Sequence, residues 1–511
     1  MQRRACVRFK NHMIRKIVLF LICIMAAISS YAQVTVYLKN GRQIRGNFVS
    51  MDNSKIVIAQ GQGNLRTSLY KEEIDKIEGF SFDEFSRAKN TYEAGHFEGK
   101  EKGFASSYKD ALKMVSEKRE LEFISEVKNE IISRENIKKY LEKKLQEEVK
   151  DEEIEEEKKL LVKLGIISPG TDYKKMVVDL FTRNIAGFYE PKENKMYVID
   201  EFASSFSPFL PSEVVLHELV HALQDQYIML DYLDEDLEKT NDDKALAVKS
   251  IIEGEATFVS YGIMADYLKK VSAGSPKSKV FDSMDIEKFI LESMMLMTTS
   301  LSPEFENKAF VHYLLFPYIN GGLFVKYAYD NGGWEKVDYV YKNYPLSTEQ
   351  IIHPEKYFIV EDKPLTLPEK DFSFLAQDGY KEISKGTLGE FTIYTLAITF
   401  LDDLYSKMLS AGWGNDSYYL YEKADKLTLI MDTRWDSVLE AEEFFKGMKA
   451  LMDKKYGNLK WSDKQSFMVA ENDDNIIYMG KKEDGVVIIE EEGKDKSTIE
   501  KITKICAFPY S

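Results

Sequence analysis

The sequence has few of the residues that crosslink or interrupt a chain. Its 511 residues include three cysteines and twelve prolines. So few prolines leave little room for long disordered tracts, and 44% hydrophobic with 30% charged residues is the composition of a well-packed globular protein. The chain is too long for one compact core, so we expect two to four domains.

An excess of positive charge is also absent. The formal net charge is −16 at pH 7, which argues against a nucleic-acid-binding protein, because such proteins need clustered positive charge to displace counterions from phosphates. The sequence shows no nucleotide-binding fingerprint, no Ser-His-Asp ordering and no Cys-His pair. These absences argue against the other hydrolase mechanisms, which depend on a bound nucleotide or on a serine or cysteine nucleophile.

Residues 1–32 have the layout of a secretory signal peptide. A basic segment precedes an apolar run at 17–28, and Ser30-Tyr31-Ala32 supplies small residues at the cleavage positions. The alternative is a membrane anchor, but the apolar run is shorter than the roughly 20 residues that span a bilayer. We expect cleavage before Gln33, no stable membrane span afterwards, and an exported protein that is periplasmic, attached to the cell envelope or secreted.

Cleavage would also decide the disulfide chemistry. Cys6 and Cys23 leave with the signal peptide, and Cys506 remains. A single cysteine cannot form an intrachain disulfide, so stability must come from burial, hydrogen bonds and metal.

Short runs of alternating apolar and polar residues occupy 33–80, with turn signals such as Asn40-Gly41 between them. The run VYLKNGRQIRGNFV resembles the opening of Sm-like or SH3-like small barrels. We expect a small β-barrel there that could bind an envelope partner. A charged, helix-prone connector is expected over 81–120, and an α+β domain over 361–511.

Two local patterns lie between these regions. A long helix is expected over 135–163, with the acidic stretch DEEIEEEKK at 151–159 as its solvated face. Residues 184–200 contain two strand-like runs around Pro-Lys-Glu-Asn-Lys, which predicts a β-hairpin.

The chemistry is concentrated in HELVH at 217–221. Two histidines four positions apart project from one face of a helix, so His217 and His221 can share a zinc ion. Glu218 can then act as the general base toward a zinc-activated water. The alternative is a pair of ordinary buried histidines, because the surrounding leucines and valines also fit a core helix.

A zinc site of this kind needs a third protein ligand, and IIEGEATF offers Glu253 and Glu255. Helical periodicity does not choose between them. The small residues Gly254 and Ala256 would let this second helix approach the HELVH helix closely. Asp225, four residues after His221, is a candidate to orient that imidazole.

These motifs together resemble the gluzincin peptidases of the aminopeptidase N type. EGEA is similar to their Asn-Glu-Gly-x-Ala segment, in which the glutamate before the glycine binds zinc, so the resemblance selects Glu253. The gap of 32 positions from His221 to Glu253 (253 − 221) is longer than usual in that family and fits an inserted acidic loop at 231–244. The expected hairpin corresponds to the family's substrate-binding edge strand.

The resemblance also extends downstream. PYINGG is similar to the family's Tyr-x-x-Gly segment and implies that Tyr318 stabilises the oxyanion, while His353 in IIHPEKY could hydrogen-bond an oxyanion or a substrate carboxylate, or could be structural. Over roughly 115–440 the chain resembles exported bacterial gluzincin-like proteins.

These observations predict an α+β protein with a gluzincin-like zincin domain at 121–360. The expected function is hydrolysis of peptide bonds in a peptide or protein substrate, with one zinc ion per chain. The alternative is a cell-envelope binding or scaffold protein whose zincin domain is catalytically idle.

Overall fold

The structure is a computed structural model of the whole chain. The residues it describes are 33–40, 42–51, 55–60, 65–78, 100–184, 187–199, 213–230, 233, 237, 240–272, 287, 290, 308–464 and 466–508. The expected signal peptide lies outside them. Helices and strands both contribute extensively, so the protein is of the α+β class. Within the described ranges, no helix is long and apolar enough to cross a membrane.

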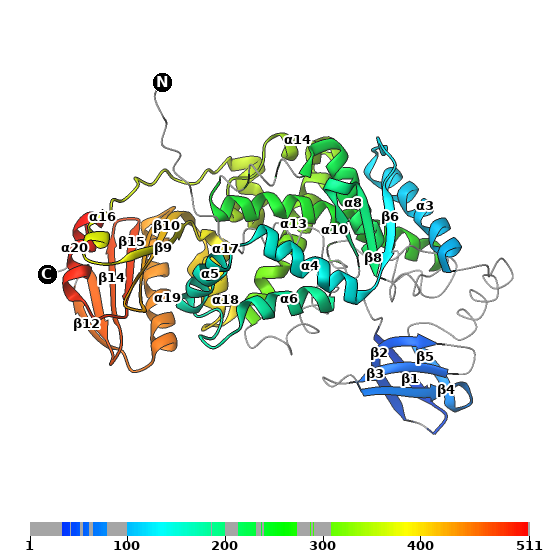
Figure 1. Cartoon of the computed structure of the whole chain (residues 1–511), viewed down its shortest axis with the longest axis horizontal. Coiled ribbons are helices and arrows are strands. Elements are labelled where there is room, and N and C mark those ends of the chain that lie inside the picture. Colours follow the sequence, from blue (N-terminus) through cyan, green and yellow to red (C-terminus); the bar gives the residue numbers. More distant parts are fainter. Residues whose placement is uncertain are drawn as a thin grey trace.

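The N-terminal region expected to be rich in strands forms a five-stranded antiparallel sheet (Figure 1). The strand order is β4-β3-β2-β1-β5. Its strands are β1 (Gln33–Leu38), β2 (Gln43–Met51), β3 (Lys55–Gln60), β4 (Leu65–Tyr70) and β5 (Ile74–Glu78). Alternating residues such as Val36, Leu38 and Ile44 are buried, which is the pattern that the sequence shows.

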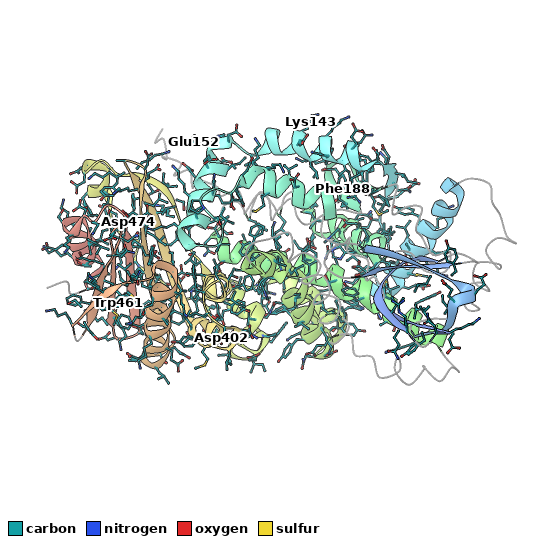
Figure 2. The ribbon with its side chains drawn as sticks, turned by 90° about the horizontal axis from the view of Figure 1, so that it is seen from below. Lys143, Glu152, Phe188, Asp402, Trp461 and Asp474 are labelled. Atoms are coloured by element: carbon teal, nitrogen blue, oxygen red, sulfur yellow. The ribbon has the colours of Figure 1, made fainter. Side chains whose placement is uncertain are left out.

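A small mixed sheet follows, with the order β6-β8-β7. Its strands are β6 (Lys128–Ile132), β7 (Gly187–Glu190) and β8 (Lys195–Ile199), with β6 parallel and β7 antiparallel to β8. The predicted hairpin is confirmed, because β7 and β8 are joined by a helical turn that Asn194 ends in the left-handed conformation. On one face Phe188, labelled in Figure 2, packs against Tyr140 with ring centroids 5.2 Å apart.

The central part of the molecule is mainly helical (Figure 1). Its helices are α3 (Lys100–Arg119), α4 (Arg134–Glu148), α5 (Asp151–Leu164), α6 (Tyr173–Asn184), α8 (Glu213–Ile228), α10 (Asp242–Ser272), α13 (Lys308–Asp330), α14 (Gly333–Lys342) and α15 (Thr348–Ile352). The connector expected over 81–120 contains α3, which contacts both α8 and α10 and buries Tyr108, Ala111 and Val115 in the same core as they do.

The single helix expected over 135–163 is wrong. The chain leaves the helical conformation at Lys150 (φ −78°, ψ 143°), which caps α5, while Val149 is buried. The expected solvated face of 151–159 is also wrong in part, because Glu156 and Glu157 are buried. Glu157 accepts a hydrogen bond from Tyr173 Oη at 3.0 Å, a partner that local sequence does not reveal.

Helices α10 and α13 cross with their backbones in close contact. A Cβ atom added to Gly254 would lie 2.2 Å from the carbonyl carbon of Gly321, and one added to Gly321 would lie 1.9 Å from the carbonyl oxygen of Ser250. Glycine at both positions is therefore a packing requirement. The expectation that Gly254 faces the HELVH helix is wrong, since its partner is α13, whereas Ala256 does pack in the core shared with α8.

The C-terminal unit is built on a seven-stranded antiparallel sheet with the order β12-β13-β14-β15-β11-β10-β9. The strands are β9 (Lys381–Gly386), β10 (Trp413–Lys423), β11 (Lys426–Trp435), β12 (Lys460–Lys464), β13 (Phe467–Glu471), β14 (Ile476–Lys482) and β15 (Gly485–Glu491). The accompanying helices are α16 (Ser373–Gln377), α17 (Gly389–Ile398), α18 (Asp403–Ser410), α19 (Val438–Tyr456) and α20 (Lys496–Cys506).

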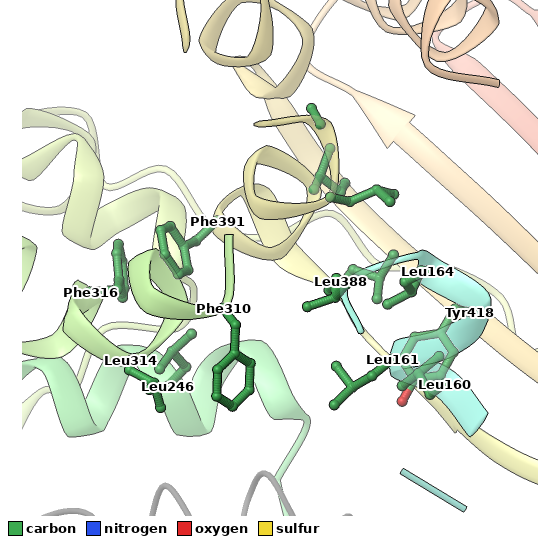
Figure 3. Packing of buried hydrophobic residues seen from close by; sticks show 14 of the residues in the cluster. Leu160, Leu161, Leu164, Leu246, Phe310, Leu314, Phe316, Leu388, Phe391 and Tyr418 are labelled. Carbon is green, nitrogen blue, oxygen red and sulfur yellow. The ribbon is translucent and has the colours of Figure 1, made fainter. Parts of the chain in front are cut away.

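This unit shares a hydrophobic core with the central helices. Figure 3 shows Leu160 and Leu164 of α5 close to Tyr418 of β10, with Phe310 of α13 and Leu388 nearby. The two units therefore stabilise one another by burying apolar area between them.

Candidate metal centre

Helix α8 places both histidines of HELVH in the interior. Every residue from Val214 to Gln224 is buried, because α8 is enclosed by α3, α10 and the small sheet. His217 and His221 are one turn apart, with ring centroids at 4.8 Å. The nitrogens Nε2 of the two rings lie 3.1 Å apart.

The third member of the cluster comes from α10. Glu253 Oε2 lies 3.1 Å from His217 Nε2 and 3.4 Å from His221 Nε2. Two ligands of a tetrahedral zinc ion, each bonded at about 2.0–2.1 Å, are about 3.3–3.4 Å apart. The three donor atoms therefore have nearly the separations that three vertices of such a site require, and each residue is at most 2% exposed.

The protonation states suit a cation. Burial lowers the pKa of His217, which favours the neutral imidazole that can donate a lone pair. Burial acts to raise the pKa of Glu253, but the two imidazoles outweigh it and the pKa lies below its ordinary value. Glu253 Oε1 is buried and has no hydrogen-bond partner among the described residues, so a positive ion would satisfy a carboxylate that is otherwise incompletely compensated.

Glu218 is held beside this cluster by the small sheet. Its Oε2 accepts a hydrogen bond from the backbone N–H of Tyr189 in β7 at 3.0 Å, while its Oε1 is buried with no partner among the described residues. Burial, and then the charge of Glu253, raises the pKa of Glu218 well above its ordinary value. A carboxylate with a raised pKa and an unengaged oxygen is suited to accepting and returning a proton near neutral pH.

The structure separates the two candidate third ligands. Glu255 is directed away from the histidines and accepts hydrogen bonds from Arg119, Tyr341 and Gln224, the last at 2.7 Å. Its carboxylate is fully engaged in that network, whereas Glu253 faces the two imidazoles.

Tyr318 of α13 also lies at the centre. Its ring is 3% exposed and stacks on His217 with centroids 5.8 Å apart and an interplanar angle of 27°. Tyr318 lies one turn before Gly321 on α13. The close crossing of α10 and α13 at Gly321 therefore places Tyr318 beside the histidine cluster.

His353 lies elsewhere. It follows α15, and its Nε2 is 3.0 Å from Glu390 Oε1 in α17. Helix α15 is anchored by Thr348 to Asp243 at the start of α10, and ten residues of helix, about 15 Å, separate Asp243 from Glu253. Among the described contacts, none joins His353 to the histidine cluster.

A second group of carboxylates lies in the same region as His353, formed by Glu349, Asp362 and Asp436. Lys356 Nζ lies 2.6 Å from Glu349, 3.0 Å from Asp362 and 2.6 Å from Asp436. The ammonium group already occupies the position that a cation would take, so these residues form an ion-pair network.

The orienting partner of His221 is a residue that the sequence did not indicate. Gln224 Oε1 lies 2.8 Å from His221 Nδ1. Asp225, the candidate from sequence, instead accepts hydrogen bonds from Tyr189 Oη and from the backbone N–H of Leu230, both at 2.8 Å. The available signal was spacing: a residue three positions after His221 lies on the same helical face.

Comparison with known protein families matches part of the chain. The model of a domain of unknown function, DUF8575, matches residues 377–502. These residues cover the seven-stranded sheet and most of its helices, and they exclude the histidine cluster. No curated protein and no solved structure matches the chain.

Proposed function

We propose that the protein is an exported zinc-dependent peptidase with a gluzincin-like catalytic domain. The observation that carries the proposal is the buried triangle of His217 Nε2, His221 Nε2 and Glu253 Oε2, with edges of 3.1–3.4 Å. These three residues would hold the metal. Zinc bound by two histidines and one glutamate supplies a Lewis acid that makes a water molecule nucleophilic near neutral pH.

The residues of the chain have distinct tasks in this proposal. Glu218, fixed by the Tyr189 N–H, removes a proton from the attacking water and delivers it to the leaving amine. Tyr318 donates a phenolic hydrogen bond to the oxyanion that forms at the attacked carbonyl. His353 receives no step, because its partner is Glu390.

The edge of β7 is the proposed substrate-binding strand. Among the described strands β7 pairs only with β8, and the N–H of Tyr189 is directed away from β8 toward Glu218. An extended peptide added to this edge would bring a carbonyl group next to Glu218, as in β-strand addition. We also propose that the N-terminal sheet closes into a small barrel that binds an envelope partner.

Zinc content and proteolysis test the proposal together. The mature chain beginning at Gln33, purified without chelators, should contain about one zinc per chain and should cleave a mixed peptide library. Glu218→Gln should retain zinc and lose cleavage. Glu213→Gln, the same change five positions earlier on α8, is the matched control and should retain both.

Two outcomes contradict the proposal in different ways. If the protein contains no zinc after mild purification, the proposed metal site is wrong. Zinc without cleavage of any peptide favours the alternative function, an envelope binding or scaffold protein with an idle centre.

A further inference from the structure

A chain of buried hydrogen bonds leads from His221 to Arg119. His221 Nδ1 lies 2.8 Å from Gln224 Oε1, Gln224 Nε2 donates to Glu255 Oε2 at 2.7 Å, and Arg119 Nε donates to Glu255 Oε1. All four residues are at most 6% exposed. They come from α8, α10 and α3, so this hydrogen-bond network crosses three helices. It ends at Arg119, about 100 residues before the HELVH motif in sequence.

The neighbours of Gln224 fix which way its amide group points. Its Nε2 lies 3.0 Å from the carbonyl oxygen of Ile252 and 2.7 Å from the carboxylate of Glu255. Both can only accept hydrogen bonds, so the amide NH₂ must face them. The amide oxygen must then face His221, and because an oxygen accepts, Nδ1 of His221 must carry the hydrogen.

At the end of the hydrogen-bond network farthest from His221, Glu255 is held in place by its donors. Arg119 and Tyr341 both donate to its carboxylate, and Arg119 also pairs with Asp338. The guanidinium group lies 4.3 Å from the ring centroid of Trp334, which restricts its plane. Arginine has donors and no acceptor, so Glu255 accepts from Arg119 at one carboxylate oxygen and from Gln224 at the other.

We propose that Arg119, Glu255 and Gln224 are positioning residues that hold His221 as the Nδ1–H tautomer. Neutral imidazole has one lone pair, and in this tautomer it is on Nε2, the nitrogen that faces His217 and Glu253. The other tautomer would place a hydrogen where a metal must bind. The consequence for zinc rests on the proposed function, whereas the tautomer itself does not.

The tautomer can be measured directly in the metal-free full-length protein. The chain has six histidines, so selective ¹⁵N labelling of histidine gives a spectrum that single substitutions can assign. At a pH about two units above the ordinary imidazole pKa of about 6.5, long-range ¹H–¹⁵N correlations distinguish Nδ1–H from Nε2–H. The wild-type protein should show His221 as Nδ1–H, and Gln224→Leu should lose this preference.

Zinc affinity provides the second readout. Competition with a chelator should show Gln224→Leu binding zinc about 10–100-fold more weakly, the usual effect of removing the partner of a ligating histidine. Gln226→Leu is the matched control, because Gln226 is on the same helix but hydrogen-bonds to the backbone of Ile124 and Ser125. It should leave both the tautomer and the affinity unchanged.

A second variant keeps the test decisive if Gln224→Leu does not fold. In Glu255→Gln, Arg119 would hold the oxygen of the new amide and leave its NH₂ facing Gln224, while the carbonyl oxygen of Ile252 would still favour the original orientation of Gln224. Mixed tautomers of His221 are therefore expected. Each of three results would overturn the inference: His221 as Nε2–H in the wild type, an unchanged tautomer in the folded variants, or a changed tautomer with unchanged zinc affinity. If His221 has the expected tautomer but the protein binds no zinc, the proposed function is wrong and the inference about the tautomer stands.

Discussion

Replacing Gly254 with alanine tests the helix crossing on which the metal centre depends. The added Cβ would lie 2.2 Å from the carbonyl carbon of Gly321, and ordinary contact begins at 3.4 Å, so α10 and α13 would have to separate by about 1.2 Å (3.4 − 2.2). Overpacking usually costs about 1–3 kcal/mol, and a backbone obstacle places this case at or above the upper end. Alanine gains about 1 kcal/mol in helix propensity, which leaves a net loss of about 2 kcal/mol or more.

Gly322, the next residue after Gly321, provides the matched control for this experiment. A Cβ there would lie 3.3 Å from Ile290 Cδ1 and 3.5 Å from Thr257 Cγ2. Both atoms are the ends of side chains, which can shift by a few tenths of an ångström. Gly322→Ala should therefore be as stable as wild type within about 1 kcal/mol.

Urea denaturation and chelator competition measure the two consequences. Gly254→Ala should have a lower denaturation midpoint and weaker zinc binding, because Glu253 is the neighbouring residue and Tyr318 is carried by the displaced helix. Gly322→Ala should change neither property. A Gly254→Ala protein that is as stable as Gly322→Ala and binds zinc like wild type would refute the close crossing.

Four other substitutions address separate parts of the proposal. Glu253→Ala should lower zinc affinity more than Glu255→Ala, because Glu253 faces both imidazoles and Glu255 acts through Gln224; the reverse ranking in a chelator titration would contradict the assignment. Tyr318→Phe keeps the ring and should keep zinc, but kcat should fall by about 10²–10³, whereas an unchanged kcat would leave Tyr318 with a packing role. Burial raises the pKa of Glu213 from 4.5 to about 8, so the folded protein retains a proton that the unfolded chain releases, and the free energy of unfolding falls as pH rises between those values. Glu213→Gln should make that fall smaller between pH 4.5 and about 8 in urea denaturation, and an identical pH dependence in both proteins would disprove it.

Local patterns were sufficient to find the main elements of the candidate site. The four-residue spacing of His217 and His221 required one helix, and the structure has it in α8. The hairpin followed from turn chemistry in Pro-Lys-Glu-Asn-Lys, and β7 and β8 are paired as expected. Both signals act over a few residues, where backbone geometry alone decides the outcome.

What sequence could not predict depends on contacts between distant residues. The acidic stretch at 151–159 reads as solvated, yet Glu157 is buried against Tyr173. Gly254 was expected to face α8, yet its partner is Gly321, 67 positions away (321 − 254). The spacing of Gln224 from His221 did not reveal its role, because that role is set by Glu255 on another helix. Periodicity identifies which face of a helix is buried, but not which helix covers it.

The contact between Arg119 and Glu255 changes where the smallest complete fragment begins. A fragment cloned from residue 121 onward would omit α3 and leave the carboxylate of Glu255 buried without its positive partner, a loss of about 3–5 kcal/mol for a buried ion pair. A fragment that begins at residue 100 would retain that partner together with the apolar residues of α3. The natural unit for expression, crystallisation or transplantation into another protein therefore begins upstream of the boundary that the sequence indicated.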